Sequence, residues 1–123
     1  MRAALRKRCA LFLVPAGFFL LAGCSSHYVQ ATIENHTNGT LRQVEVDYPS
    51  AGFGTDQIAS QAAFHYRFKI QGSGDIKITF TDAAGKAQNA TGPELSEGEL
   101  GALHISIEAG NRVTWSTDLT EKR

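Results

Sequence analysis

The sequence predicts an all-β fold, a single antiparallel β-sandwich of about six to seven strands, preceded by a segment of different character. Two observations predict it. After Cys24, apolar and polar residues alternate with a period of two, and no stretch keeps apolar residues at helical spacing. The alternating runs are short and recur about every 8–12 residues, with turn-forming residues between them. A small β-barrel is the alternative architecture.

The predicted strands are the runs that alternate in polarity. They lie at residues 28–34, 41–48, 63–70, 75–81, 101–108 and 112–117, with a weaker run at 86–91. Each run has one polar face, which is typical of antiparallel sheets that expose one side to water. In the run at 63–70 we expect Phe64, Tyr66 and Phe68 to point inward. Trp115 in the last run is expected to be buried.

Turn-forming residues separate these runs. Asn38-Gly39 predicts a type I′ hairpin between the first two runs, because that turn requires positive φ at both positions. Residues 72–74, Gly-Ser-Gly, predict a second hairpin. Residues 82–86 predict a third, with Gly85 in the left-handed conformation. Residues 109–111 turn the chain into the last strand.

The predicted domain spans residues 28–119, and residues 120–123 form a frayed tail. Its size and strand count resemble those of immunoglobulin- and fibronectin-type domains, although the Cys…Trp…Cys signature of immunoglobulin domains is absent. The sequence contains no internal repeat and no sign of a second domain. It therefore predicts a single folded unit.

Residues 1–23 have the pattern of an export signal. Their four basic residues are Arg2, Arg6, Lys7 and Arg8. A run of apolar and small residues follows at 10–23, about 14 residues and thus about 21 Å long as a helix. A bilayer core of about 30 Å needs about 20 such residues, so this run is too short to span it. A basic stretch before a short apolar run is typical of a secretory signal peptide.

The end of this segment resembles the lipobox of bacterial lipoproteins. Leu21, Ala22, Gly23 and Cys24 give its order of a branched aliphatic residue, two small residues and a cysteine. Small residues before the cut let a peptidase approach the backbone. The cysteine sulfur accepts a diacylglyceryl group.

The resemblance covers residues 1–25 and implies a location for the protein. Signal peptidase II would cleave before Cys24, which leaves residues 24–27 as a lipidated N-terminus and short tether. Two or three acyl chains hold a protein at a membrane far more firmly than one chain does. Ser25 stands where lipoproteins retained at the inner membrane carry aspartate, so the resemblance implies the outer membrane.

Removing the signal changes the charge and thiol content. The whole chain has 12 basic and 12 acidic residues, and the remainder after residue 23 has 8 basic residues against 12 acidic ones, a net charge of −4. This balance argues against nucleic-acid binding. Cys9 leaves with the signal and lipid blocks Cys24, so neither a disulfide nor a cysteine-based metal site is expected. No cofactor is expected.

The candidate ligand site is the longest predicted loop, residues 48–56. Phe53 lies between two glycines there, and an aromatic ring on a polar loop can stack on a sugar or on a partner's apolar patch. The alternative is that Phe53 folds down and closes one end of the sandwich. Tyr48 and Asp56 complete the candidate site. Asp47 and Asp56 lack the dense oxygen-ligand spacing of a calcium loop, so no metal site is expected.

Two further groups of polar residues are candidate sites. None of the four histidines has HxH or HxxxH spacing, which argues against zinc, although His65 and His104 would converge if their strands were neighbours. His65, Arg67 and Lys69 form a basic row, which Lys77 would extend across a hairpin. This row is either an ordinary solvated face or a docking surface for an anionic envelope polymer such as lipopolysaccharide or peptidoglycan.

No sequence motif indicates catalysis. The chain lacks a G-x-S-x-G elbow, an H-E-x-x-H motif and a phosphate-binding glycine loop. The leading hypothesis is a membrane-anchored bacterial lipoprotein that is a non-enzymatic binding or assembly module and contacts an envelope protein or polymer. The alternative is a carbohydrate or small-ligand binding domain that uses residues 48–56. An enzyme with a dispersed site is the third hypothesis.

Overall fold

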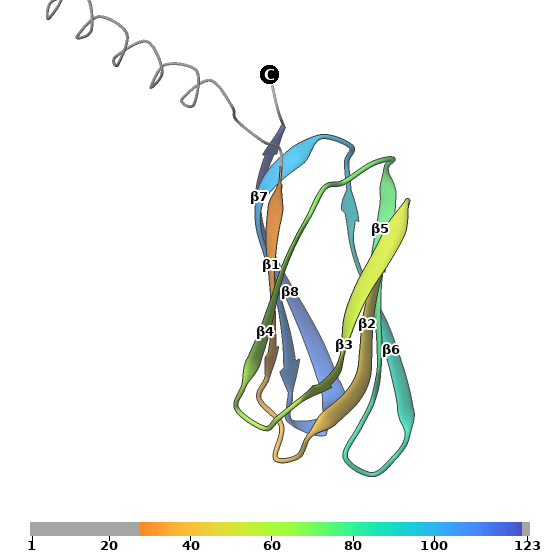
Figure 1. The fold of residues 1–123 in the computed structure, drawn as a ribbon, viewed down its shortest axis with the longest axis vertical. Helices are drawn as coiled ribbons and strands as arrows, with labels where there is room; N and C mark the ends of the chain where they lie inside the picture. The colour runs from red at the N-terminus through yellow and green to blue at the C-terminus, as the bar shows by residue number, and fades with distance from the viewer. Residues whose placement is uncertain (1–27, 122–123) are drawn as a thin grey trace, which may run out of the picture.

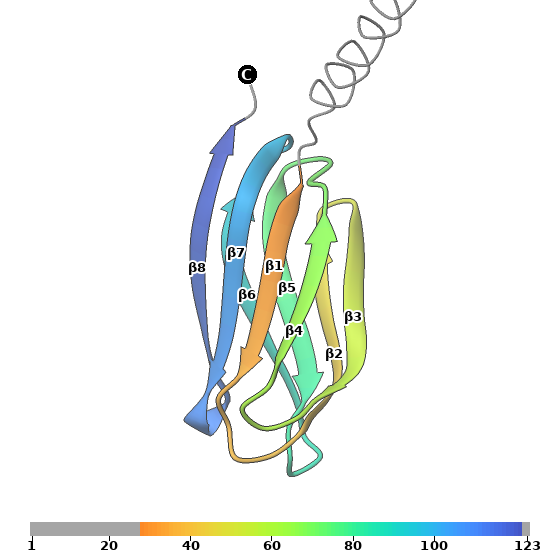
Figure 2. The same cartoon turned by 60° about the vertical axis from the view of Figure 1, so that its left-hand side comes forward.

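The computed structural model describes residues 28–121, which form two four-stranded sheets packed face to face (Figures 1 and 2). The eight strands are β1 (Val29–Asn35), β2 (Leu41–Tyr48), β3 (Ala51–Ile58), β4 (Ala63–Phe68), β5 (Gly74–Thr81), β6 (Ala87–Leu95), β7 (Glu99–Glu108) and β8 (Arg112–Glu121). A 3₁₀ turn at Ala109–Asn111 joins the last two strands. The predicted all-β sandwich is confirmed. It has one strand more than expected, because the predicted loop at 48–56 supplies β3.

The strand order is β4-β1-β7-β8 in one sheet, called the β1 sheet below, and β3-β2-β5-β6 in the other, called the β2 sheet. All neighbours run antiparallel except β1 and β7, which are parallel. Both β1 and β7 run away from the end of the sandwich at which β8 finishes (Figure 2). That end is called the N-terminal pole, because the described chain begins there.

Only some of the predicted turns join paired strands. Residues 82–86 connect β5 to β6 with Gly85 at φ 85°, and residues 109–111 connect β7 to β8, as predicted. The hairpins predicted at Asn38-Gly39 and at 72–74 are wrong. Both segments carry the chain from one sheet to the other, and neither Asn38 nor Gly39 has positive φ. Local turn chemistry does not determine the sheet that the next strand joins.

The core lies between the two inner faces. Its most deeply buried side chains are Val29, Ile33, Leu41, Val44, Val46, Ile76, Ile78, Leu95, Leu103, Ile105 and Ile107. Nine of these eleven residues occupy the inward positions of the alternating runs, so the pattern predicted most of the core. Leu41 is out of phase with Val44 because of an irregularity in β2, and Leu95 lies beyond the predicted run at 86–91. Tyr66 points inward as expected, since its ring stacks on that of Phe53, but 43% of it is exposed. Trp115 is only half-buried. Both residues lie on edge strands, whose inner faces border the open sides of the sandwich.

The C-terminal strand is longer than predicted. Thr120 pairs with Leu100 and Glu121 pairs with Glu99, so two residues of the predicted tail at 120–123 belong to β8. The other two residues of that tail lie outside the described part of the chain. Within residues 28–121 no helix is long and apolar enough to cross a membrane.

Candidate functional site

Residues 48–56 form a tight hairpin and not the predicted loop. Tyr48 ends β2 and Ala51 begins β3, so the turn consists of Pro49 and Ser50 alone. The Phe53 side chain is only 6% exposed and packs into the core. The ring is folded down, as in the alternative given above, but it closes the side of the sandwich where β3 and β4 meet and not one end. A ring in that position is not available to stack on a sugar.

Phe53 belongs to a group of aromatic rings at the side of the sandwich where β3 and β4 meet. Its ring centroid lies 4.4 Å from that of Tyr66 and 5.3 Å from that of Phe68. Tyr48 packs against Phe68 at 4.5 Å. Burial of Tyr48, with a smaller contribution from nearby Tyr66, raises the pKa of its phenol. Tyr48 thus supports the seam between the sheets, and only part of it faces solvent.

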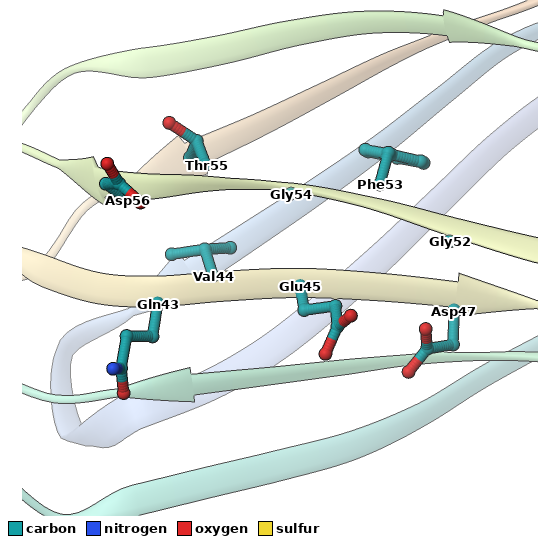
Figure 3. Close-up of a pocket in the computed structure, with 9 residues that line it drawn as sticks. All are labelled: Gln43, Val44, Glu45, Asp47, Gly52, Phe53, Gly54, Thr55 and Asp56. Carbon is teal, nitrogen blue, oxygen red and sulfur yellow. The ribbon is translucent and has the colours of Figure 1, made fainter.

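Beside this hairpin, on the outer face of the β2 sheet, lies an open groove of about 580 Å³ (Figure 3). We call it the acidic groove. The residues that line it are Gln43, Val44, Glu45, Asp47, Gly52, Phe53, Gly54, Thr55 and Asp56. Glu45 and Asp47 extend from β2 on the side opposite to Val44 and Phe53 (Figure 3). Of the three predicted ligand residues, Asp56 is the one that contributes an exposed side chain to this groove.

The floor of the groove is made by two glycines of β3 that lie directly opposite the acidic residues. Gly54 pairs with Glu45, and Gly52 pairs with Asp47. A Cβ atom at Gly52 would come within 2.5 Å of the Asp47 carboxylate, and one at Gly54 would collide with the Val44 carbonyl oxygen. Gly54 is therefore needed for space, and a side chain at Gly52 would displace the Asp47 carboxylate.

A β-bulge at one end of the groove sets the orientation of its acidic residues. Gln43 has φ 49°, and the pairing of β2 with β5 shifts register between Arg42 and Glu45. The bulge leaves Arg42 and Gln43 both exposed, while Leu41 and Val44 on either side stay buried. Arg42 donates a hydrogen bond of 2.9 Å to Gln57 and so does not reach the carboxylates of the groove.

The carboxylates of the groove form no ion pair within residues 28–121. Within residues 28–121 the single ion pair joins His36 to Glu34 at 3.2 Å. Lys77 pairs in register with Asp47 from β5, yet their charged groups form no ion pair. The groove can therefore accept hydrogen bonds from hydroxyl or cationic groups of a partner. In the described part of the chain, no three His, Cys, Asp or Glu side chains are grouped to hold a metal ion.

The histidines on the β1 sheet do not converge. His65 on β4 and His104 on β7 both pair with Thr32 of β1, on its two opposite sides. Thr32 Oγ1 lies 3.2 Å from His65 Nδ1. Because a whole strand separates the two histidines, their strands are not the neighbours that a shared metal site requires.

The basic row runs along β4 toward the N-terminal pole and does not include Lys77. His65 and Arg67 lie on the outer side of β4, and Lys69 directly follows this strand, but β5, which carries Lys77, belongs to the other sheet. The Arg67 Cζ atom lies 4.5 Å above the ring of Tyr28, and the Lys69 Nζ atom lies 5.2 Å from the same centroid. Sequence reasoning missed Tyr28, because the contact joins segments that are distant along the chain.

The opposite pole is held by buried polar side chains. Asp82 Oδ1 accepts hydrogen bonds from the backbone N–H groups of Ala84 and Lys86, and its Oδ2 accepts them from Gln88 and Asn111. These bonds, above all that from Lys86, lower the pKa of Asp82. They fix the β5–β6 turn against the β7–β8 turn. A depression of about 330 Å³ lies between these turns and residues 37–39.

Comparisons with known proteins identify the fold alone. No protein-family model matches the chain, and no curated protein matches it. An NMR structure of a protein from Eubacterium rectale is similar, with a TM-score of 0.55 over 76% of this chain and 93% of that chain. The two sequences are 11% identical, so this similarity supports the fold and carries no function. The predicted lipobox residues, Leu21, Ala22, Gly23 and Cys24, lie outside the described residues.

Proposed function

We propose that the chain is a bacterial lipoprotein, held at the cell envelope by lipid on Cys24, that acts as a non-enzymatic binding or assembly module. The lipobox-like sequence supports the anchor and the outer-membrane location. Three residues separate Cys24 from Tyr28, where the described domain begins. The domain is therefore tethered close to the membrane.

The observation that carries the binding role is the acidic groove. Glu45 and Asp47 stand over a glycine floor without an ion-pair partner in residues 28–121. An exposed face of this kind suits an envelope protein or polymer that presents cationic or hydroxyl groups. The carbohydrate alternative depended on a stacking ring at Phe53, and that ring is buried. For this reason we prefer an extended partner to a small sugar.

Site-specific photo-crosslinking in the cell envelope tests this role. A photoreactive residue at Glu45 samples the groove, one at Ser116 samples the outer face of the β1 sheet, and one at Ala84 samples the pole opposite the tether. We expect a discrete adduct from the Glu45 position and weaker ones from the other two. Absence of adducts from all three positions in correctly processed protein would contradict a binding module.

A further inference from the structure

We propose that the N-terminal pole is a docking surface for anionic phospholipid headgroups, formed by Tyr28, Arg67 and Lys69. This inference rests on the proposed function, because it takes Cys24 as the membrane anchor. It adds to that function a defined orientation of the domain on the membrane. Once anchored, the domain turns the β4 side of its pole toward the bilayer.

The length of the tether places these residues beside the membrane. Tyr28 is four residues after Cys24, and an extended chain covers at most about 3.6 Å per residue. The lipidated cysteine and Tyr28 are therefore at most about 14 Å apart. The electrostatic screening length at physiological salt is about 8 Å, so charges at this pole interact with the headgroups whenever the tether is well short of its full length. Charges at the opposite pole, about seven strand residues or roughly 23 Å farther away, are screened.

The geometry of the cluster suits a membrane surface. Arg67 and Lys69 are exposed and lie 4.5 and 5.2 Å from the Tyr28 ring centroid, so one ring holds two cations together. The Tyr28 carbonyl oxygen accepts a hydrogen bond of 3.2 Å from the N–H group of Gly101, which fixes this residue to β7. Tyrosine beside basic residues is a common combination at the membrane interface.

The distribution of charge at this pole determines which side of the domain faces the membrane. Arg67 and Lys69 are absent from the single ion pair found within residues 28–121, so their charges are not neutralised by a nearby described carboxylate. The acidic residues Glu99 and Glu121 pair with each other in register on β7 and β8. The pole therefore has a basic side at β4 and an acidic side at β8. An anionic bilayer attracts the first side and repels the second.

The test uses the lipidated protein, purified from membranes and reconstituted into phosphatidylcholine vesicles with or without phosphatidylglycerol. A water-soluble amine-reactive reagent labels exposed lysines, and mass spectrometry reads each site. Lys69 reports on the proposed surface, while Lys77 on the β2 sheet and Lys86 at the opposite pole are internal controls. We expect phosphatidylglycerol to lower the labelling of Lys69 by about fivefold, with little change at the controls. About 1 M salt should abolish this protection.

Two variants with the same change of charge make the test specific. Arg67→Gln should reduce the protection of Lys69, whereas Lys77→Gln, which removes one charge from the other sheet, should not. Circular dichroism verifies that both remain folded. Equal labelling of Lys69 in both kinds of vesicle, or equal protection of all three lysines, would overturn the proposal. Protection of Lys69 by purified peptidoglycan, without protection by phosphatidylglycerol, would overturn it in favour of a polymer.

The same spectra separate this inference from the proposed function. The mass of the N-terminal peptide shows whether Cys24 carries lipid. Lipidated protein with uniformly labelled lysines would overturn the docking surface alone. Protein without lipid on Cys24 would overturn the proposed function and the docking surface with it.

Discussion

The ring of Phe53 on β3 stacks on the ring of Tyr66 on β4, with centroids 4.4 Å apart and ring planes 12° apart. These two strands are the edges of different sheets, and few other contacts join them. The pair therefore closes one open side of the sandwich. A residue that the sequence suggested for ligand binding is instead part of what holds the two sheets together.

Phe53→Ala should destabilise the domain by about 3 kcal/mol, because it removes a buried ring and leaves a cavity. Urea unfolding monitored by circular dichroism measures this loss. Tyr66→Ala, at a half-exposed position, should destabilise the domain less than Phe53→Ala does. In the double variant we expect a coupling of about 1 kcal/mol between the two rings. A loss below about 1 kcal/mol for Phe53→Ala would mean that Phe53 is not a core residue.

Gly54→Ala should destabilise the domain by about 1–3 kcal/mol, because a Cβ atom there collides with the backbone of β2. Asp56→Ala is the control, since it alters an exposed side chain of the same strand and groove without adding a buried atom. Its unfolding midpoint in urea should stay close to that of the unaltered protein. If both substitutions prove equally harmless, the close approach of the two strands is not required.

Asn35→Ala should also weaken the fold. The buried Asn35 side chain donates hydrogen bonds to the carbonyl oxygens of Gly39 and Ile58 and accepts two from Thr37. Its removal leaves several buried polar groups without partners, which should lower the free energy of unfolding by about 3 kcal/mol. Asn38→Ala, three residues later in the same crossing between sheets, should have a much smaller effect. Equal urea midpoints for the two variants would contradict this assignment.

Asp82 should make stability depend on pH in the acid range. Its folded pKa is lowered, first by the hydrogen bond from Lys86, so its contribution is complete above the ordinary aspartate pKa of about 3.9. The contribution is lost as the pH falls from there through the folded pKa. The stability difference between the unaltered protein and Asp82→Asn should therefore be constant from pH 7 to 5 and shrink by pH 3. A difference that stays unchanged at pH 3 would show that the carboxylate charge is not involved.

The alternation of polar and apolar residues predicted seven of the eight strands and most of the core. It missed β3, because the outward positions of that strand are Gly52, Gly54 and Asp56, which are typical of a loop. These glycines lie opposite acidic residues of β2. The steric reason for having glycine there becomes visible only when β2 is paired with β3. The groove itself could not be predicted for the same reason.

Pairing between distant strands explains the other errors. Asn38-Gly39 has the composition of a hairpin, but the Asn35 side chain fixes that segment as a crossing between sheets. Tyr66 alternates like a core residue and is exposed because β4 lies at a sheet edge. The contact of Arg67 and Lys69 with Tyr28 likewise depends on the pairing of β4 with β1. Local sequence patterns contain no information about these neighbours.

The most direct test of the lipid anchor at Cys24 is the mass of the N-terminal peptide of the protein isolated from bacterial membranes. A chain that begins at Cys24 and carries diacylglyceryl and acyl groups is the expected result, with Cys24→Ala accumulating as full-length precursor without lipid. A mature chain that begins elsewhere, or Cys24→Ala protein that still incorporates labelled fatty acid, would contradict the lipoprotein anchor on which the proposed function depends.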